Sequence, residues 1–298
     1  MVRRQNRHVD ARGVVPVVID AALPETGLTL IEVIVALVVA AVLGAAATAT
    51  LLAVRRGVSI QLHQSSVSAT ARTAGLVLSR EFRAIGVGDS SGADLSMLTP
   101  AAVRYRAWRG MYIVCAPSNP GSGSLTVAAP GRAWRGPDAL VDSLLVLVSA
   151  PDSGGHEEHY WWPADLVSVS GGGTCPGGVA GLRLVLAGVS SGRLVGVRVG
   201  NPVRVFETVE VRAYRGGSGR WWLGRRRARK TGGWPAIQPF VGPLAVGGLV
   251  LTYQNGTGGV AVGPADVVTI GVELTMPPAP GGLGRGGRRV VFRVARRD

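Results

Sequence analysis

An apolar run over residues 28–54 constrains this chain more than any other feature of its sequence. One charged residue, Glu32, interrupts the run near its start. As a helix the run would extend roughly 40 Å, which exceeds the roughly 30 Å hydrocarbon core of a bilayer. A carboxylate inside such a segment is costly and is a functional candidate by default. The run therefore predicts a membrane-spanning helix that carries a functional residue.

The residues just before this run form a recognisable order. A polar leader ends at Gly27, and Leu-Thr-Leu-Ile-Glu follows it directly. This arrangement closely resembles the processing site of type IV prepilins and pseudopilins. The resemblance implies that a membrane-embedded prepilin peptidase cuts between Gly27 and Leu28 on the cytoplasmic side and then N-methylates Leu28. Many family members have Phe where this chain has Leu28, which is a mild departure.

The same resemblance implies a role for Glu32 in assembly. In the family, this glutamate meets the N-terminal amine of a neighbouring subunit. The pairing is chemically sensible because a carboxylate in hydrocarbon needs a partner, and an ammonium on the adjacent helix supplies it. The alternative to an assembly role is that the helix is a membrane anchor and that Glu32 merely sits at the headgroup boundary.

An ordinary secretory signal peptide is the rival interpretation of the N-terminus. Four arginines in the first twelve residues would be its basic region, residues 33–43 its apolar region, and residues 45–47 or 47–49 its A-x-A cleavage site. The basic region would then be unusually long, and Glu32 would abut the apolar stretch. We favour the prepilin interpretation because it accounts for both Gly27 and Glu32.

Composition adds weaker constraints. About 200 of the 298 residues remain after the leader and the helix, which suits one globular domain. The formal net charge is +14, but Lys230 is the only lysine among 32 basic residues. Such a skew reflects a GC-rich genome more than a functional choice, so basicity says little about partners.

The chain has two cysteines, Cys115 and Cys175, and both lie in the part predicted to be outside the cytoplasm. An oxidising compartment permits them to pair. The sequence predicts a disulfide between them, and two free thiols are the alternative.

Periodicity predicts the fold class. One helical face recurs at Val67, Ala71, Ala74, Leu78, Phe82 and Ile85. The membrane helix is therefore expected to continue outward and to lay this stripe on a globular domain. Short β-branched runs follow at residues 143–149, 182–189, 193–199, 203–214 and 290–294, and residues 268–275 alternate as a half-buried antiparallel strand. An Asn-Gly hairpin signal ends residues 249–256. We expect an α+β protein, a long N-terminal helix packed on an antiparallel β-sheet domain, pilin-like in outline.

A looser resemblance concerns the C-terminal half. The segments 208–214, 220–226 and 242–249, followed by Tyr253, are similar to J-type minor pseudopilins of type II secretion and to PilW-like minor pilins. In those proteins a strand, a turn and a second strand ending in Leu-x-Arg precede a strand that ends in Tyr. The resemblance implies a minor rather than a major subunit.

Two motifs resemble chemical sites but lack the context that such sites need. His156-Glu-Glu-His159 has the wrong spacing for a zinc-protease helix, which needs His at i and i+4, and we expect a polar loop there. Gly282–Gly287 fits the G-x-G-x-x-G pattern, but it precedes a strand rather than a helix. We expect no catalytic residue, no metal and no cofactor.

A basic segment near three tryptophans is the one patch that suggests nucleic acid. Phosphate attraction combined with aromatic stacking is how single strands are held. The alternative is a solvated hairpin tip, which we favour. Its basic residues are Arg225, Arg226, Arg227, Arg229 and Lys230.

These inferences combine into a domain plan and a function. We expect a leader at 1–27, a transmembrane assembly helix at 28–54, its amphipathic continuation at 55–88, and an extracytoplasmic β-rich domain at 89–298. The chain is interpreted as a minor pilin or pseudopilin of the inner membrane that assembles into a filament with other pilin subunits. A DNA-binding competence pilin and a conventionally secreted or anchored β protein are the alternatives.

Overall fold

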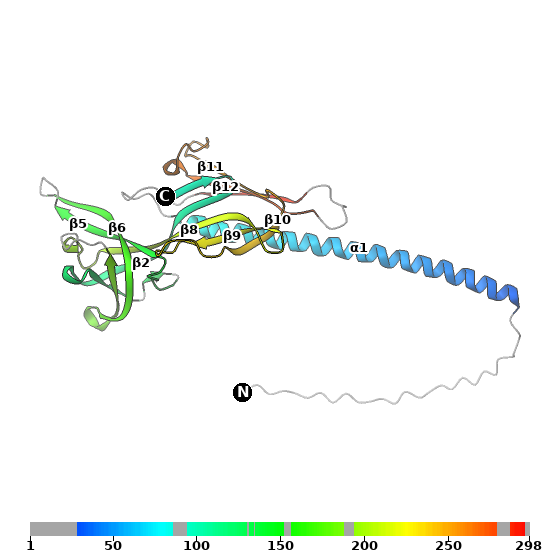
Figure 1. Ribbon diagram of the computed structural model, residues 1–298, viewed down its shortest axis with the longest axis horizontal. Coiled ribbons are helices and arrows are strands. Elements are labelled where there is room, and N and C mark those ends of the chain that lie inside the picture. The colour runs from blue at the N-terminus through cyan, green and yellow to red at the C-terminus, as the bar shows by residue number, and fades with distance from the viewer. Residues whose placement is uncertain are drawn as a thin grey trace, which may run out of the picture. The chain divides into compact units, whose positions relative to one another are not determined.

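The computed structural model describes residues 29–85, 94–129, 131–133, 135–151, 156–187, 194–278 and 287–295. One long helix precedes a series of antiparallel strands, so the predicted α+β class is confirmed (Figure 1). The helix is α1 (Leu30–Arg83). The strands are β1 (Leu95–Thr99), β2 (Ala102–Asn119), β3 (Ser124–Ala128), β4 (Arg132–Ala133), β5 (Asp142–Pro151), β6 (Glu157–Thr174), β7 (Ala180–Ala187), β8 (Pro202–Arg215), β9 (Trp221–Arg227), β10 (Gln238–Leu244), β11 (Leu249–Gln254), β12 (Thr269–Thr275) and β13 (Arg289–Ala295).

The chain divides into two compact units, Met1–Gly57 and Val58–Asp298, and the boundary falls within α1. In the first unit every described residue is exposed. In the second unit α1 buries the stripe that its periodicity predicts. Val67, Ala74, Leu78 and Phe82 are buried, and Ala71 is half-buried at the edge of the stripe. The distal half of α1 is therefore amphipathic and packs on the β domain.

The larger sheet closes on itself. Its strands follow the order β1-β2-β3-β7-β6-β5-β8-β9-β10, and β2 also pairs with β8. Because β2 and β8 are long, one half of each belongs to a closed barrel of β2, β3, β7, β6, β5 and β8. The other halves continue into an open extension with β1, β9 and β10. A β-bulge at Trp108–Gly110 shifts the register where the two parts of β2 meet.

Each part of the sheet has its own apolar core. The barrel interior is filled by one cluster of buried side chains, among them Val114, Leu144 and Trp162. A second cluster joins the α1 stripe to the open extension and to the smaller sheet β11-β12-β13. Figure 1 shows β8, β9 and β10 beside the distal end of α1, with β11 and β12 as a separate layer.

The smaller sheet follows the predicted alternation. Ile270, Val272 and Leu274 of β12 are buried, and β12 pairs with β11 and β13 on its two sides. The Asn-Gly signal marks a local turn, since Asn255 N donates to Gly259 O at 2.9 Å. This turn does not join β11 to β12 directly, because residues 255–268 and a short 3-10 helix lie between them.

The strand predicted at residues 193–199 is wrong. Among its described residues, 194–199 form a helical turn followed by irregular chain. Leu194 and Val197 are buried with the barrel core, and the two are joined by a turn hydrogen bond of 3.0 Å from Val197 N to Leu194 O. Gly196 lies so close to β5 that an added Cβ would approach Val148 Cγ1 to 2.6 Å. The apolar run thus packs as a turn against the barrel, and its composition alone does not distinguish these two forms.

Candidate functional site

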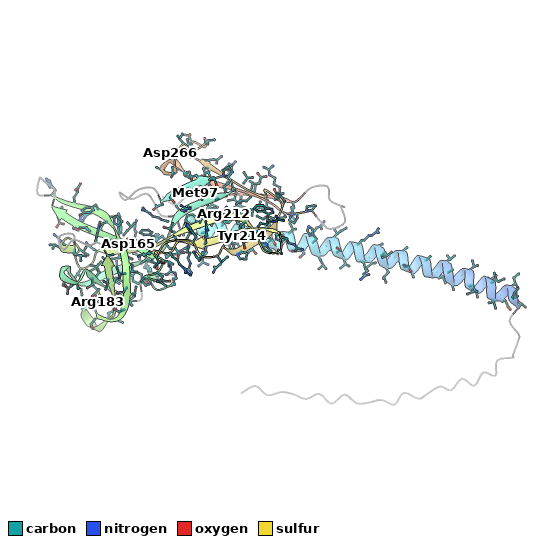
Figure 2. The ribbon with its side chains drawn as sticks, viewed as in Figure 1. Met97, Asp165, Arg183, Arg212, Tyr214 and Asp266 are labelled. Carbon is teal, nitrogen blue, oxygen red and sulfur yellow. A yellow bond between two sulfur atoms is a disulfide. The ribbon has the colours of Figure 1, made fainter. Side chains whose placement is uncertain are left out.

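The proximal half of α1 is apolar and uncovered. Large side chains such as Leu30, Leu37 and Leu43 are at least 64 % exposed. Side chains project from both sides of this part of the helix (Figure 2). Among the described residues, one helix is long and apolar enough to cross a bilayer, with a mean hydropathy of 2.7 in its most apolar window. A helix that is apolar all round belongs in a hydrophobic medium rather than in water.

Glu32 closes a capping box at the start of α1. Thr29 N and Thr29 Oγ1 donate to Glu32 Oε2 at 3.0 and 3.1 Å, and Glu32 N donates back to Thr29 Oγ1 at 3.4 Å. Such a box satisfies backbone donors that the first turn leaves without a partner. The carboxylate is thereby held at the N-terminal end of the helix, next to the segment that the prepilin motif concerns.

A second acidic residue, Glu81, fixes the distal end of α1 to the sheet. Its side chain is 9 % exposed and accepts hydrogen bonds from three residues of the open extension. Tyr105 Oη donates to Glu81 Oε2 at 3.1 Å and Arg109 Nη2 donates to the same oxygen at 3.0 Å, while Arg225 Nη1 pairs with Glu81 Oε1. The helix is therefore joined to β2 and β9 by a buried carboxylate as well as by apolar packing.

Arg109 extends this arrangement into a buried chain of charges. The bulge in β2 places Arg109 between the registered residues Trp108 and Gly110 and directs its guanidinium inward. Arg109 Nε donates to Glu207 Oε1 at 2.7 Å, and Arg135 Nη2 donates to Glu207 Oε2 at 2.8 Å. Arg135 also holds Asp142 through two contacts of 2.6 Å. The chain of charges links α1 to β2, β8 and β5.

The ionisation of these groups follows from burial and charge together. Burial raises the pKa of Glu207, but Arg109 and Arg135 outweigh it and leave that pKa below its ordinary value. Burial raises the pKa of Asp142 in spite of the hydrogen bonds from Arg135. Burial also raises the pKa of Tyr105 well above its ordinary value, and the charge of Glu81 adds to the effect. Tyr105 thus remains a neutral donor to a charged carboxylate.

Sequence reasoning did not single out this chain of charges. Glu81 lies three residues after Leu78, at the edge of the apolar stripe, and Glu207 has the inward parity of Val205 and Val209 in β8. A charged residue at an inward position of a helix or strand is the sequence signal that could have indicated a buried ion pair. It does not identify the partner, because Glu81 and Arg225 are separated by 144 positions.

The basic segment predicted as a possible nucleic-acid patch is largely engaged within the fold. Arg225 pairs with Glu81, and Arg226 Nη2 lies 2.7 Å from Glu210 Oε1. Arg227 Nη1 is 3.5 Å from Glu207 Oε2, and Lys230 Nζ donates to Leu166 O at 2.7 Å. Burial lowers the pKa of Lys230. Arg229 is exposed.

Trp234, one of the tryptophans near the basic segment, also contacts side chains of its own chain. The guanidiniums of Arg104 and Arg226 lie 4.8 and 4.7 Å from the centroid of its ring. Both arginines contact the carboxylate of Glu210 as well. The ring is therefore part of an intramolecular cation–π contact, which stabilises the outer face of the open extension.

The structure contains a disulfide between Cys115 and Cys175, as the sequence predicts. Their Cα atoms are 5.3 Å apart, within the range for this bond. Cys115 lies on β2 and Cys175 precedes the short turn between β6 and β7. The bond therefore joins β2 to the turn between β6 and β7 and closes a loop of sequence separation 60.

Replacing Cys175 with serine is expected to lower the free energy of unfolding of the β domain by about 2–4 kcal/mol, because the open loop gains chain entropy in the unfolded state. Urea unfolding of the full chain in a non-ionic detergent, followed by tryptophan fluorescence, measures this change. All seven tryptophans lie after residue 107, so the signal reports the β domain. Equal stability of the wild-type protein with and without reductant would contradict the expectation.

The His156–His159 segment is not the polar loop that we expected, because residues from Glu157 onward belong to β6. They pair with the end of β5, where Ser149 lies opposite His159. Ser149 Oγ and His159 Nδ1 are 2.9 Å apart. No group of three or more candidate metal ligands occurs among the described residues. Gly27, Leu28 and most of the Gly282–Gly287 motif lie outside the described residues.

Comparison with known proteins identifies the N-terminal segment. A family model described as a prokaryotic N-terminal methylation motif matches residues 24–48, which include Gly27, Leu28 and Glu32. The chain is thus prepilin-like at its N-terminus, and this motif implies processing by a prepilin peptidase. Together with the apolar helix, it indicates a membrane-anchored, extracytoplasmic, pilin-like protein. Searches among curated proteins and among solved structures gave no match.

Proposed function

We propose that the chain is a minor pilin or pseudopilin, a structural subunit of a type IV pilus or of a type II secretion pseudopilus. The observation that carries the proposal is the methylation motif at residues 24–48, which leads into a single helix from Leu30 to Arg83. The exposed apolar half of that helix suits a bilayer and then a filament core. Its distal half is joined to the β domain by buried apolar and charged contacts.

In this proposal the leader is cytoplasmic, Gly27 is the last residue removed, and Leu28 becomes the methylated N-terminus. Residues 28–54 form the transmembrane and assembly segment, residues 55–88 its amphipathic continuation, and residues 89–298 the extracytoplasmic domain. Glu32 meets the ammonium of a neighbouring subunit. Its capping box keeps the carboxylate at the helix start, where such an ammonium would lie.

The minor-subunit assignment is supported by the elaborate β domain. The barrel of β2, β3, β7, β6, β5 and β8 is added to an open sheet that already covers the α1 stripe. The segments that resemble J-type pseudopilins and PilW-like minor pilins fall in β8, β9, the end of β10 and β11. Buried side chains of these strands belong to the same core cluster as the α1 stripe. We propose a position at which this domain caps or decorates the filament.

A DNA-binding competence pilin is the second candidate, and the basic segment was its basis. The pairing of Arg225, Arg226 and Arg227 with carboxylates of the same chain argues against it. A duplex or single strand would have to compete with those contacts. Salt-dependent binding of an oligonucleotide by the full chain would support this candidate, and the absence of binding at low salt would exclude it.

Processing is the direct test of the proposal. The mature protein should begin at N-methylated Leu28, as read by mass spectrometry of the protein from membranes. A bulky residue in place of Gly27 should abolish cleavage, whereas Gly27→Ala should retain part of it, since the peptidase needs a small, flexible backbone at the cut. A start at Thr48 or Thr50 would contradict the proposal and would support a conventionally secreted β protein.

A further inference from the structure

A hollow of about 740 Å³ lies where the C-terminal end of α1 meets the barrel, and arginines dominate its lining. Arg80 and Arg83 come from the last turn of α1, and Arg132 comes from β4. Arg109 also lines the hollow, but its charge is balanced by Glu81 and Glu207. None of the lining residues that the structure describes is acidic. The described lining of the hollow is therefore positively charged.

The backbone holds this site in a fixed form. Ile85 forms a β-bridge with Ala107, and Trp108 N donates to Ala84 O at 2.6 Å, so the end of α1 is tied to the edge of β2. On the other side, β4 pairs closely with β2, and Gly110 allows this approach. A Cβ at Gly110 would come within 2.4 Å of Ala133 Cβ. Arg132 is thereby placed opposite Met111.

The helix dipole explains only part of this cluster. Cations in the last turn of a helix interact favourably with its C-terminal end, which accounts for Arg80 and Arg83. It does not account for Arg132, which lies on β4. The pairing of β4 with β2 brings Arg132 to the same hollow. Arg83 and Arg132 are both exposed, and neither has an ion pair within the part of the chain that the structure describes.

Most of the remaining lining residues are apolar, and two of them are exposed. Leu76 is 74 % exposed and Trp108 is 37 % exposed, although both lie beside the packed end of α1. Met111 completes this wall. Arginine, tryptophan and methionine around an apolar floor are the residue types enriched at protein–protein interfaces. Guanidinium forks also match carboxylates in a bidentate geometry.

We propose that this hollow binds an acidic peptide segment of a partner protein, with carboxylates on Arg83 and Arg132 and apolar side chains against Leu76 and Trp108. A nucleic acid fits less well, because single-strand sites align several aromatic rings along a groove. Trp108 is the one aromatic ring among the described lining residues. This inference does not depend on the proposed filament role.

The test uses the full chain in nanodiscs of phosphatidylcholine, a lipid without net charge. Fluorescence anisotropy would measure binding of a fluorescein-labelled peptide, Gly-Glu-Leu-Glu-Leu-Glu-Gly, and of its counterpart with Gln in place of each Glu. The variant Arg83→Gln/Arg132→Gln is compared with Arg220→Gln/Arg293→Gln, which removes the same charge from exposed arginines outside the hollow. Urea unfolding of both variants checks that the fold is intact.

We expect the Glu peptide to bind the wild-type protein, and the Arg83/Arg132 variant to bind it about tenfold or more weakly, since two charge-assisted contacts are lost. The Arg220/Arg293 variant should bind within about twofold of wild type. Equal losses in the two variants, or no binding of the Glu peptide at millimolar concentration, would overturn the proposal. Tighter binding of a twenty-nucleotide oligothymidylate that depends on Arg83 and Arg132 would assign the hollow to nucleic acid instead.

Discussion

Replacing Glu81 with alanine is expected to lower the free energy of unfolding of the β domain by about 3–5 kcal/mol, the usual cost of removing one partner of a buried ion pair. The substitution leaves Arg109 with only Glu207 and leaves the buried hydroxyl of Tyr105 without its acceptor. A buried polar group that loses its partner carries its full desolvation cost. Urea unfolding of the full chain in detergent, followed by tryptophan fluorescence, measures the change.

Two further variants separate charge from hydrogen bonding. Glu81→Gln removes the charge but can still accept a hydrogen bond from Tyr105, so it should destabilise less than alanine does. Glu273→Gln is the matched control, because the Glu273–Arg289 pair lies at the surface, with the Arg289 side chain 65 % exposed. Its effect should stay below about 1 kcal/mol. If Glu81→Ala were no more destabilising than this control, Glu81 would not hold α1 on the sheet.

Replacing Glu32 with glutamine is expected to lower incorporation of the subunit into its filament about a hundredfold. In the assembly that we propose, the Leu28 ammonium of the adjoining subunit would lose its partner in a medium of low dielectric constant, a loss of about 3–5 kcal/mol. Membrane insertion should not suffer, because removing a charge from an apolar helix lowers its cost of transfer. Co-purification with the filament, at matched membrane levels of wild type and variant, measures incorporation.

The capping box supplies the control for this experiment. Glutamine can still accept a hydrogen bond from Thr29 N, so Glu32→Gln leaves the start of α1 largely capped. Thr29→Ala does the opposite: it removes the hydroxyl that bonds to Glu32 and keeps the carboxylate, at a cost of about 1 kcal/mol to the helix start. We expect Thr29→Ala to be incorporated nearly as well as wild type. Equal incorporation of Glu32→Gln would mean that the carboxylate has no role in assembly.

The parts of the fold that were predictable are those set by local pattern. The α1 stripe from Val67 to Phe82 recurs with the helical period, and β12 alternates with the period of a strand, so both could be read from neighbouring residues. The disulfide could be anticipated because the chain has only Cys115 and Cys175. The run at residues 193–199 misled us, because a short apolar turn has the same composition as a short strand.

The basic segment shows a different limit. Its sequence of arginines beside tryptophans suggests a charged surface, and nothing in residues 225–230 indicates otherwise. The fold brings Glu81, Glu207 and Glu210 to these arginines from α1 and β8. Two of those carboxylates lie on a strand that pairs with β9, which is a consequence of sheet register rather than of local sequence.

The sequence by itself determined that this chain has a prepilin-like N-terminus, an apolar helix with an amphipathic continuation, and antiparallel strands behind it. Those features depend on residue order and on periodicity within one element. Only the tertiary structure decided that β2 pairs with β8 to close a barrel, that Glu81 meets Arg109 and Arg225, and that Arg83 and Arg132 share one hollow. The physical reason is that a charge or a strand edge is satisfied by whichever group the packed core brings near it, and that group can lie anywhere in the chain.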